Sequence, residues 1–81
     1  MTKEQMIQVA AILTTLAEVE GCPESSLYLL VGCDWEQFEK LSFILRGAGF
    51  IEIKGHYCTI TSKGREIADK LNATLTAAKG V

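Results

Sequence analysis

The fold is decided by residues 50–61, which read Phe50-Ile51-Glu52-Ile53-Lys54-Gly55-His56-Tyr57-Cys58-Thr59-Ile60-Thr61. Apolar and polar side chains alternate on both sides of the Gly55-His56 pair, which is the period of a half-buried strand. A two-residue loop with glycine first suits a tight hairpin turn, and it pairs Ile53 with Cys58 and Ile51 with Ile60. The stretch therefore predicts a β-hairpin whose core face is formed by these four side chains.

Three helices are expected before the hairpin, and the first two follow from apolar residues that recur at helical spacing. The first begins after Thr2 and stops at Gly21. The second is brief: Pro23 is tolerated in the first turn of a helix, and Gly32 closes the segment.

A third helix is expected to start at about Trp35, because Asp34 and Gln37 have the spacing of a capping box. In that motif the Asp34 carboxylate accepts an early backbone N–H and the Gln37 side chain reaches back to the cap. The apolar stripe of this helix consists of Phe38, Leu41 and Leu45, widened by Ile44. Residues 47–49 end the helix. Since only residues 32–33 separate it from the second helix, the pair predicts a helix-turn-helix.

The segment after the hairpin predicts a last helix, capped by Thr61 or Ser62. Its apolar seam is Ile67, Ala68, Leu71 and Leu75. Residues 76–81 are expected to fray. The chain is thus expected to form one domain over residues 1–81, with a core from about residue 3 to 75. It is mainly α with a small β-hairpin.

Two stretches of the chain resemble the winged helix-turn-helix family, in particular regulators of the multiple-antibiotic-resistance and phenolic-acid-repressor type. Leu45-Arg46-Gly47-Ala48-Gly49-Phe50-Ile51-Glu52-Ile53 is similar to the family's helix ending and entry to the wing. Ile60-Thr61-Ser62-Lys63-Gly64-Arg65-Glu66-Ile67-Ala68 is similar to the exit from the wing. The resemblance implies a three-helix core, a two-stranded wing and a C-terminal helix.

By this resemblance the third helix enters the major groove of duplex DNA and the wing lies on the backbone, as in transcriptional regulators. The implied DNA-binding residues are Gln37, Lys40, Arg46, Lys54, His56, Lys63 and Arg65. Gln37 is suited to adenine, and Lys40 to guanine or phosphate. Asp34, Glu36 and Glu39 depart from this pattern, since their carboxylates face a negative groove.

A protein-interaction module is the alternative function. Aromatic side chains dominate interface hot spots, and Trp35, Phe43 and Tyr28 are candidate anchors, with Ile44 beside them. Packing into the core is the other interpretation of all three aromatic side chains, and for Trp35 partial burial against the second helix is favoured over a hot spot.

Length, composition and charge limit the class of protein and the kinds of partner that it can bind. The 81 residues are 48% apolar with a net charge of -2, which excludes disorder and leaves too little chain for a large enzyme with a deep pocket. Residues 1–39 carry one base and seven acids, whereas residues 40–81 carry seven bases and three acids. A polyanion should therefore meet the second half. The apolar surplus favours a homodimer formed through the first and last helices.

The remaining residues indicate no chemistry of their own. Cys22, Cys33 and Cys58 lack a metal-binding spacing and are interpreted as reduced thiols, so no metal or cofactor is expected. His56, the only histidine, has no evident acid-base partner, and no catalytic motif is present, so we do not expect an enzyme. With no segment of membrane-spanning length and no secretory signal, a cytoplasmic location is expected.

Overall fold

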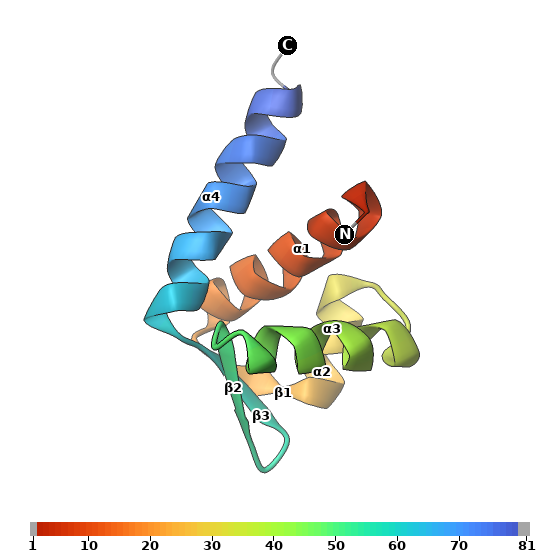
Figure 1. Ribbon diagram of the computed structural model, residues 1–81. Helices are drawn as coiled ribbons and strands as arrows, with labels where there is room; N and C mark the ends of the chain where they lie inside the picture. The colour runs from red at the N-terminus through yellow and green to blue at the C-terminus, as the bar shows by residue number, and fades with distance from the viewer. Residues whose placement is uncertain (1, 80–81) are drawn as a thin grey trace.

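The computed structural model describes the backbone of residues 2–79 and the side chains of residues 2–74. Over this range the chain is mostly helical, with a small antiparallel three-stranded sheet (Figure 1). In chain order the elements are α1 (Lys3–Val19), β1 (Cys22–Pro23), α2 (Glu24–Val31), α3 (Trp35–Gly47), β2 (Ile51–Lys54), β3 (Tyr57–Ile60) and α4 (Ser62–Lys79). The hairpin and the far end of α4 project from opposite ends of the molecule.

The helix starts follow from their caps. At α1 the capping box is complete: Gln5 N donates to Thr2 Oγ1 at 3.1 Å, and Thr2 N donates to Gln5 Oε1 at 3.0 Å. At α3 only half of the predicted box forms, with Gln37 N donating to Asp34 Oδ1 at 2.8 Å. The predicted return of the Gln37 side chain to the Asp34 backbone is wrong. Gln37 Nε2 instead donates to Gln8 Oε1 of α1 at 3.1 Å.

The register of the hairpin is confirmed: Ile51 pairs with Ile60 and Ile53 with Cys58. The turn differs in detail from a glycine-first turn. Both Gly55 and His56 have positive φ, at 54° and 68°, as a type I′ turn requires. His56 therefore occupies a left-handed conformation that few residues other than glycine adopt, and in which His is enriched together with Asn and Asp.

The structure contains a third strand, β1, that the sequence does not predict. Cys22 and Pro23 pair with Cys58 and Tyr57 of β3, which gives the strand order β1-β3-β2. Pro23 is the N-cap of α2 rather than part of its first turn. The close approach of the strands uses Gly21, whose φ is 116° and where a Cβ atom would lie 3.1 Å from the Cys58 carbonyl oxygen. Two residues are too few to show a period in the sequence.

The core lies where α1, α2 and α3 meet the inner face of the sheet. The predicted α3 stripe is confirmed for Phe38, Leu41 and Leu45, which are buried. Ile44, placed at the margin of that stripe, is instead 53% exposed. The core consists of Val9, Ile12, Leu13, Leu16, Cys22, Leu27, Phe38, Leu41, Leu45, Ile51, Cys58 and Ala68.

The junction between hairpin and α4 is held by Thr61. Its hydroxyl lies 2.7 Å from the Gly49 carbonyl oxygen and 3.0 Å from that of Phe50, donates toward both, and accepts from Gly64 N at 3.0 Å. Thr61, rather than Ser62, thus caps α4. A Cβ atom at Gly64 would overlap the Phe50 carbonyl oxygen. Thr61 and Gly64 therefore have structural roles at this junction: Thr61 makes the hydrogen bonds, and Gly64 leaves room for the Phe50 backbone.

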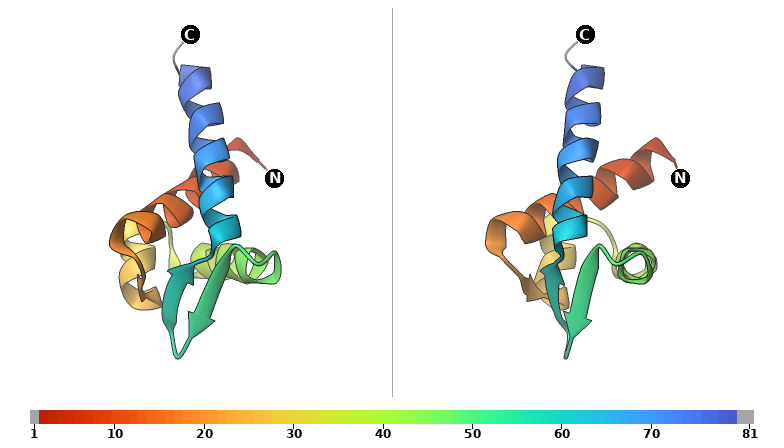
Figure 2. Two further views of the ribbon diagram at one scale, coloured as in Figure 1. Left: turned by 90° about the vertical axis from the view of Figure 1, so that its left-hand side faces the viewer. Right: turned by 60° about the vertical axis from the view of Figure 1, so that its left-hand side comes forward.

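The last helix packs on α1 over its first turns and then rises away from the body, as both views of Figure 2 show. Asn72 Nδ2 donates to Thr14 Oγ1 at 2.8 Å. The helical backbone runs to Lys79, past the expected start of the frayed tail, and residues 80–81 of that tail lie outside the described residues. Within the described chain, no helix combines the length and hydrophobicity needed to cross a bilayer.

Candidate nucleic-acid interface

The surface of α3 opposite the core is uncovered by the described part of the chain. It lies beside β2, and the right-hand view of Figure 2 looks along this helix with the hairpin next to it. We call its exposed side chains the α3 face: Trp35, Glu36, Glu39, Lys40, Phe43, Ile44 and Arg46. The helix reaches this position because its apolar stripe is buried and a turn of three residues, Gly32–Asp34, joins it to α2.

Three of the predicted DNA-binding lysine and arginine residues lie on this side of the molecule with exposed side chains, together with His56. Lys40 and Arg46 belong to the α3 face, and Lys54 ends β2 at the hairpin tip. Glu36 and Glu39 are on the α3 face as well. The face therefore carries two acids and two bases, so its own formal charge is zero, and Lys54 is offset by the exposed Glu52 two residues earlier on β2.

The predicted base reader Gln37 is turned toward α1. Its amide donates to Gln8, and the side chain is half-buried. A bidentate contact with adenine needs both the donor and the acceptor of an amide. Gln37 would have to leave Gln8 to make that contact.

Lys63 and Arg65 are tied into the junction and the α1–α4 contact rather than the α3 face. Lys63 Nζ donates to the Ala48 carbonyl oxygen at 3.2 Å, near the end of α3, and lies 5.4 Å from the centre of the Phe50 ring. Arg65 lines a cleft between α1 and α4 that also includes Glu18 and Asp69. The sequence places both bases around the end of the third helix and the wing: Lys63 lies there, whereas Arg65 lines the cleft between α1 and α4.

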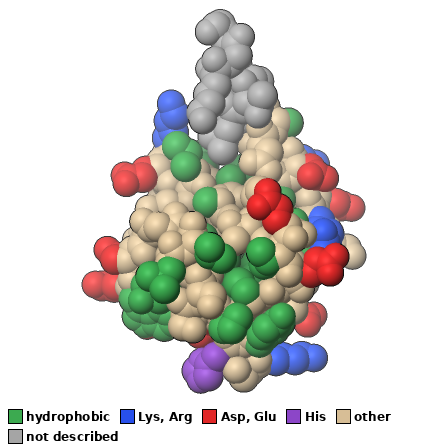
Figure 3. All heavy atoms as spheres, turned by 180° about the vertical axis from the view of Figure 1, so that it is seen from behind, with side chains coloured by type: hydrophobic (Ala, Val, Ile, Leu, Met, Phe, Trp, Pro, Cys, Tyr) green, Lys and Arg blue, Asp and Glu red, His purple; other side chains and the backbone are tan. Residues whose placement is uncertain are grey.

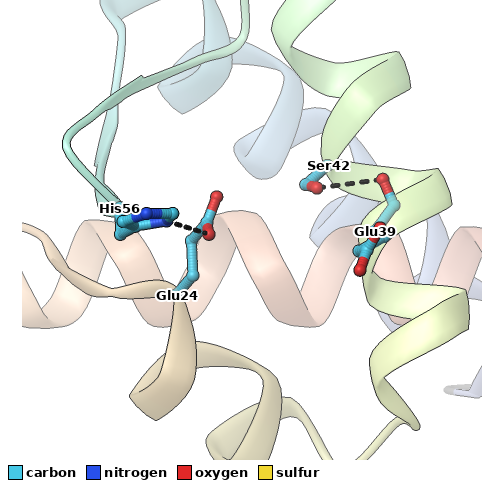
Figure 4. Close-up of polar contacts among 4 residues, drawn as sticks. All are labelled: Glu24, Glu39, Ser42 and His56. Carbon is cyan, nitrogen blue, oxygen red and sulfur yellow. Dashed lines mark hydrogen bonds and ion pairs between the residues drawn. The ribbon is translucent and has the colours of Figure 1, made fainter.

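His56 ties the hairpin tip to the start of α2. Its Nδ1 lies 3.3 Å from Glu24 Oε2, and its backbone carbonyl accepts from Glu24 N at 2.8 Å (Figure 4). The His56 side chain is 91% exposed, whereas that of Glu24 is 17% exposed. Glu24 is thus a site residue that no local sequence pattern identifies, because its partner His56 is 32 residues away.

A groove runs between the α3 face and the hairpin. Trp35, Glu39, Phe43 and Arg46 form the α3 side, and Ile53 and His56 form the hairpin side. Figure 4 shows Glu24 and His56 across from the segment of α3 that holds Glu39 and Ser42. The buried Ser42 hydroxyl donates to the Glu39 carbonyl oxygen at 3.0 Å, so it is satisfied within the helix.

The aromatic candidates for a protein interface divide into two kinds. Trp35 and Tyr28 pack with the buried Phe38, at ring-centre distances of 5.5 and 6.2 Å, and with each other at 5.0 Å. Phe43 is 78% exposed and has Ile44 beside it on the same helix. Phe43 and Ile44 are therefore surface side chains, while Trp35 and Tyr28 stabilise the α2–α3 packing.

Apolar exposure is not confined to α3. Leu29 and Leu30 of α2 are also exposed. Figure 3 shows hydrophobic side chains gathered over the lower half of the rear face, with acidic side chains around its margins. Gathered apolar surface of this kind is typical of a face that contacts a partner.

The cysteines are free thiols, with Cys22 and Cys58 buried and Cys33 half-buried. Burial, with a smaller contribution from the Glu24 charge, raises the pKa of Cys58 to about 12. Among the side chains of residues 2–74, no three His, Cys, Asp or Glu residues converge on a metal-sized position.

No protein-family model matches the chain, and no curated protein matches it either.

Proposed function

We propose that this chain is a winged helix-turn-helix domain that binds duplex DNA and acts as a cytoplasmic transcriptional regulator. The observation that carries the proposal is the uncovered α3 face beside a projecting hairpin, with α2 joined to α3 by a turn of three residues. An α-helix fits the major groove, and a hairpin alongside it reaches the backbone. In this arrangement Lys40 and Arg46 meet base edges or phosphates, and Lys54 meets the backbone.

The charge of the interface argues for modest affinity. Each phosphate contact contributes through counterion release, and only Lys40, Arg46, Lys54 and the exposed His56 lie on this side among the predicted bases. Glu36 and Glu39 oppose the duplex. A second copy doubles the basic surface, which is why we include a homodimer in the proposal.

The dimer is proposed to form through α1 and α4. Ile7 and Val19 of α1 are exposed, and α4 extends beyond its contact with α1. Light scattering coupled to size exclusion should give about twice the chain mass of 8.9 kDa at micromolar concentration. A mass of 8.9 kDa at about 100 µM would refute the dimer without touching the DNA proposal.

Fluorescence anisotropy with random-sequence and genomic duplexes at low salt tests DNA binding. We compare the native chain with a triple variant, Lys40→Gln, Arg46→Gln and Lys54→Gln. The matched control is Lys70→Gln, which removes an exposed base from α4. The triple variant should bind more weakly and lower the salt slope by about 2–3, while the control leaves both unchanged. No binding of the native chain at about 50 µM, or binding without salt dependence, refutes the proposal.

A second candidate function is a protein-interaction module that uses the same face. The observation in its favour is the exposure of Phe43 and Ile44 in the middle of α3, next to Glu36 and Glu39. Exposed aromatic side chains are typical interface anchors. If the face binds protein, Phe43→Ser should abolish capture of the partner, while the Lys40/Arg46/Lys54 variant retains it. If the charge variant loses binding and Phe43→Ser keeps it, the result favours DNA.

A further inference from the structure

Two of the three cysteines face each other across neighbouring strands. Cys22 of β1 and Cys58 of β3 are directly paired, so their side chains lie on the same face of the sheet. Both belong to the buried core. The bond from Glu24 N to the His56 carbonyl identifies Glu24–His56 as a hydrogen-bonded position of the ladder. Because such positions alternate in an antiparallel ladder, Cys22–Cys58 is one as well.

This pairing brings the two thiols within reach of a disulfide. At a hydrogen-bonded position the Cα atoms are about 5.5 Å apart, which is a common Cα separation in disulfides. The Cβ atoms of directly opposite residues are about 4.5–5.5 Å apart, whereas a relaxed disulfide needs about 3.8 Å. Because hydrogen-bonded pairs lie at the upper end of that range, the two Cβ atoms must approach each other by about 1.5 Å. A bond made under such strain is easily reduced, as regulatory disulfides are.

Access to the pair depends on β1. This strand has two residues, and Pro23 has no N–H to donate to a ladder. Cys22 is 8% exposed and Cys58 is 0% exposed. Burial raises the pKa of both thiols, so they are unreactive while β1 is closed. Release of this short strand from β3 exposes Cys22, while Cys58 stays in the core on the central strand and meets Cys22 again when β1 closes.

We propose that Cys22 and Cys58 form an oxidant-responsive pair that a low-molecular-weight disulfide such as oxidised glutathione converts to an intramolecular disulfide. The Cys22 thiolate attacks one sulfur of oxidised glutathione, whose S–S bond breaks and releases one glutathione thiolate. The Cys58 thiolate then attacks the Cys22 sulfur and releases the second. The two protons of the cysteine thiols end on the two glutathione molecules, so two electrons pass from the protein to the oxidant.

The bond would link β3 to the segment directly before α2. Since Glu24 begins α2, the hairpin would then be covalently fixed relative to α2 and α3. Reduced glutathione reverses the step. This inference rests on the strand pairing alone and holds whether the α3 face binds DNA or protein.

The test uses the full chain carrying Cys33→Ser, which leaves only the proposed pair. The folded variant, checked by circular dichroism, is equilibrated in glutathione buffers of decreasing reduced-to-oxidised ratio and quenched with acid. Intact mass should fall by about 2 Da, and trypsin should give peptides 4–40 and 55–63 joined by a disulfide. A variant with both Cys22→Ser and Cys33→Ser should keep Cys58 unmodified while folded.

The same titration in guanidinium supplies the decisive comparison. Closing a loop of about 36 residues favours the folded chain, and strain opposes it, so the folded chain should be oxidised at a reduced-to-oxidised ratio at least about tenfold higher than the unfolded chain. An equal or lower ratio would mean that the native geometry opposes the bond. Glutathionylation of Cys22 with no loss of the Cys58 thiol would overturn the proposal as well.

Discussion

Replacing Gly64 by alanine sets two opposing effects against each other. Gly64 lies in the first turn of α4 and has no positive φ, so alanine should favour the helix by about 0.5–1 kcal/mol. The added methyl group would, however, overlap the backbone carbonyl oxygen of Phe50, which cannot rotate away as a side chain would. Overpacking of this kind costs about 1–3 kcal/mol and more where backbone must move.

The overlap should win. We expect Gly64→Ala to lower the free energy of unfolding by about 2 kcal/mol, which for a chain of this size lowers the Tm by about 8–16 °C. Gly47→Ala is the matched control: it is also a helical glycine without positive φ, and nothing lies within 4 Å of its added Cβ. That variant should be as stable as the native chain or more stable by up to about 1 kcal/mol.

Thermal and urea denaturation followed by helical circular dichroism measure both variants. The overlap with Phe50 predicts that the same substitution changes the free energy of unfolding in opposite directions at the two glycines. If Gly64→Ala is at least as stable as the native chain, then the hairpin and α4 do not approach as closely as described. If both variants lose stability equally, the Phe50 contact is not the cause.

Three further predictions concern the junction, the α3 face and the buried thiol. Thr61→Val should lower the free energy of unfolding by about 1–2 kcal/mol because it removes the α4 cap and the donor to two carbonyls, while Thr61→Ser retains most of it; equal stability of Val and Ser variants in urea would contradict this. If α3 enters the groove, Glu36→Gln combined with Glu39→Gln should strengthen duplex binding several-fold at low salt, and an unchanged Kd by anisotropy would mean that these side chains never approach DNA. Because the pKa of Cys58 is raised to about 12 in the folded chain, the unfolded chain loses its thiol proton first as pH rises. Stability is therefore full below about pH 9 and falls above it by up to about 1.4 kcal/mol per pH unit, and Cys58→Ala should show a shallower decline in urea melts at pH 8–10.

The parts of the fold that the sequence predicts are those with a strong local period. The hairpin register follows from alternation around Gly55-His56, and the buried stripe of α3 follows from helical spacing after Asp34. Both depend on neighbours a few residues away. β1 escapes such reasoning because its partner is about 36 residues distant in sequence and the strand is too short for a period.

The candidate site is predicted less well, because the direction of a side chain depends on tertiary neighbours. Gln37 has the spacing of a capping residue, yet the position of α1 offers Gln8 as a better partner. Lys63 is a base next to the wing, yet the end of α3 presents it with the carbonyl of Ala48. Composition identifies where positive charge is available, but it does not tell which charges remain free for a ligand.

The two outer strands of the sheet limit how these molecules meet one another. Pro23 lies at a position whose missing N–H would point away from β3, so β1 offers no donor there to a strand of another molecule. On the other side, β2 is flanked by α3. Sheet edges that are short, proline-bearing or flanked by a helix resist edge-to-edge aggregation. Pairing of sheet edges between two copies is therefore disfavoured, and the hairpin tip stays clear of such contacts.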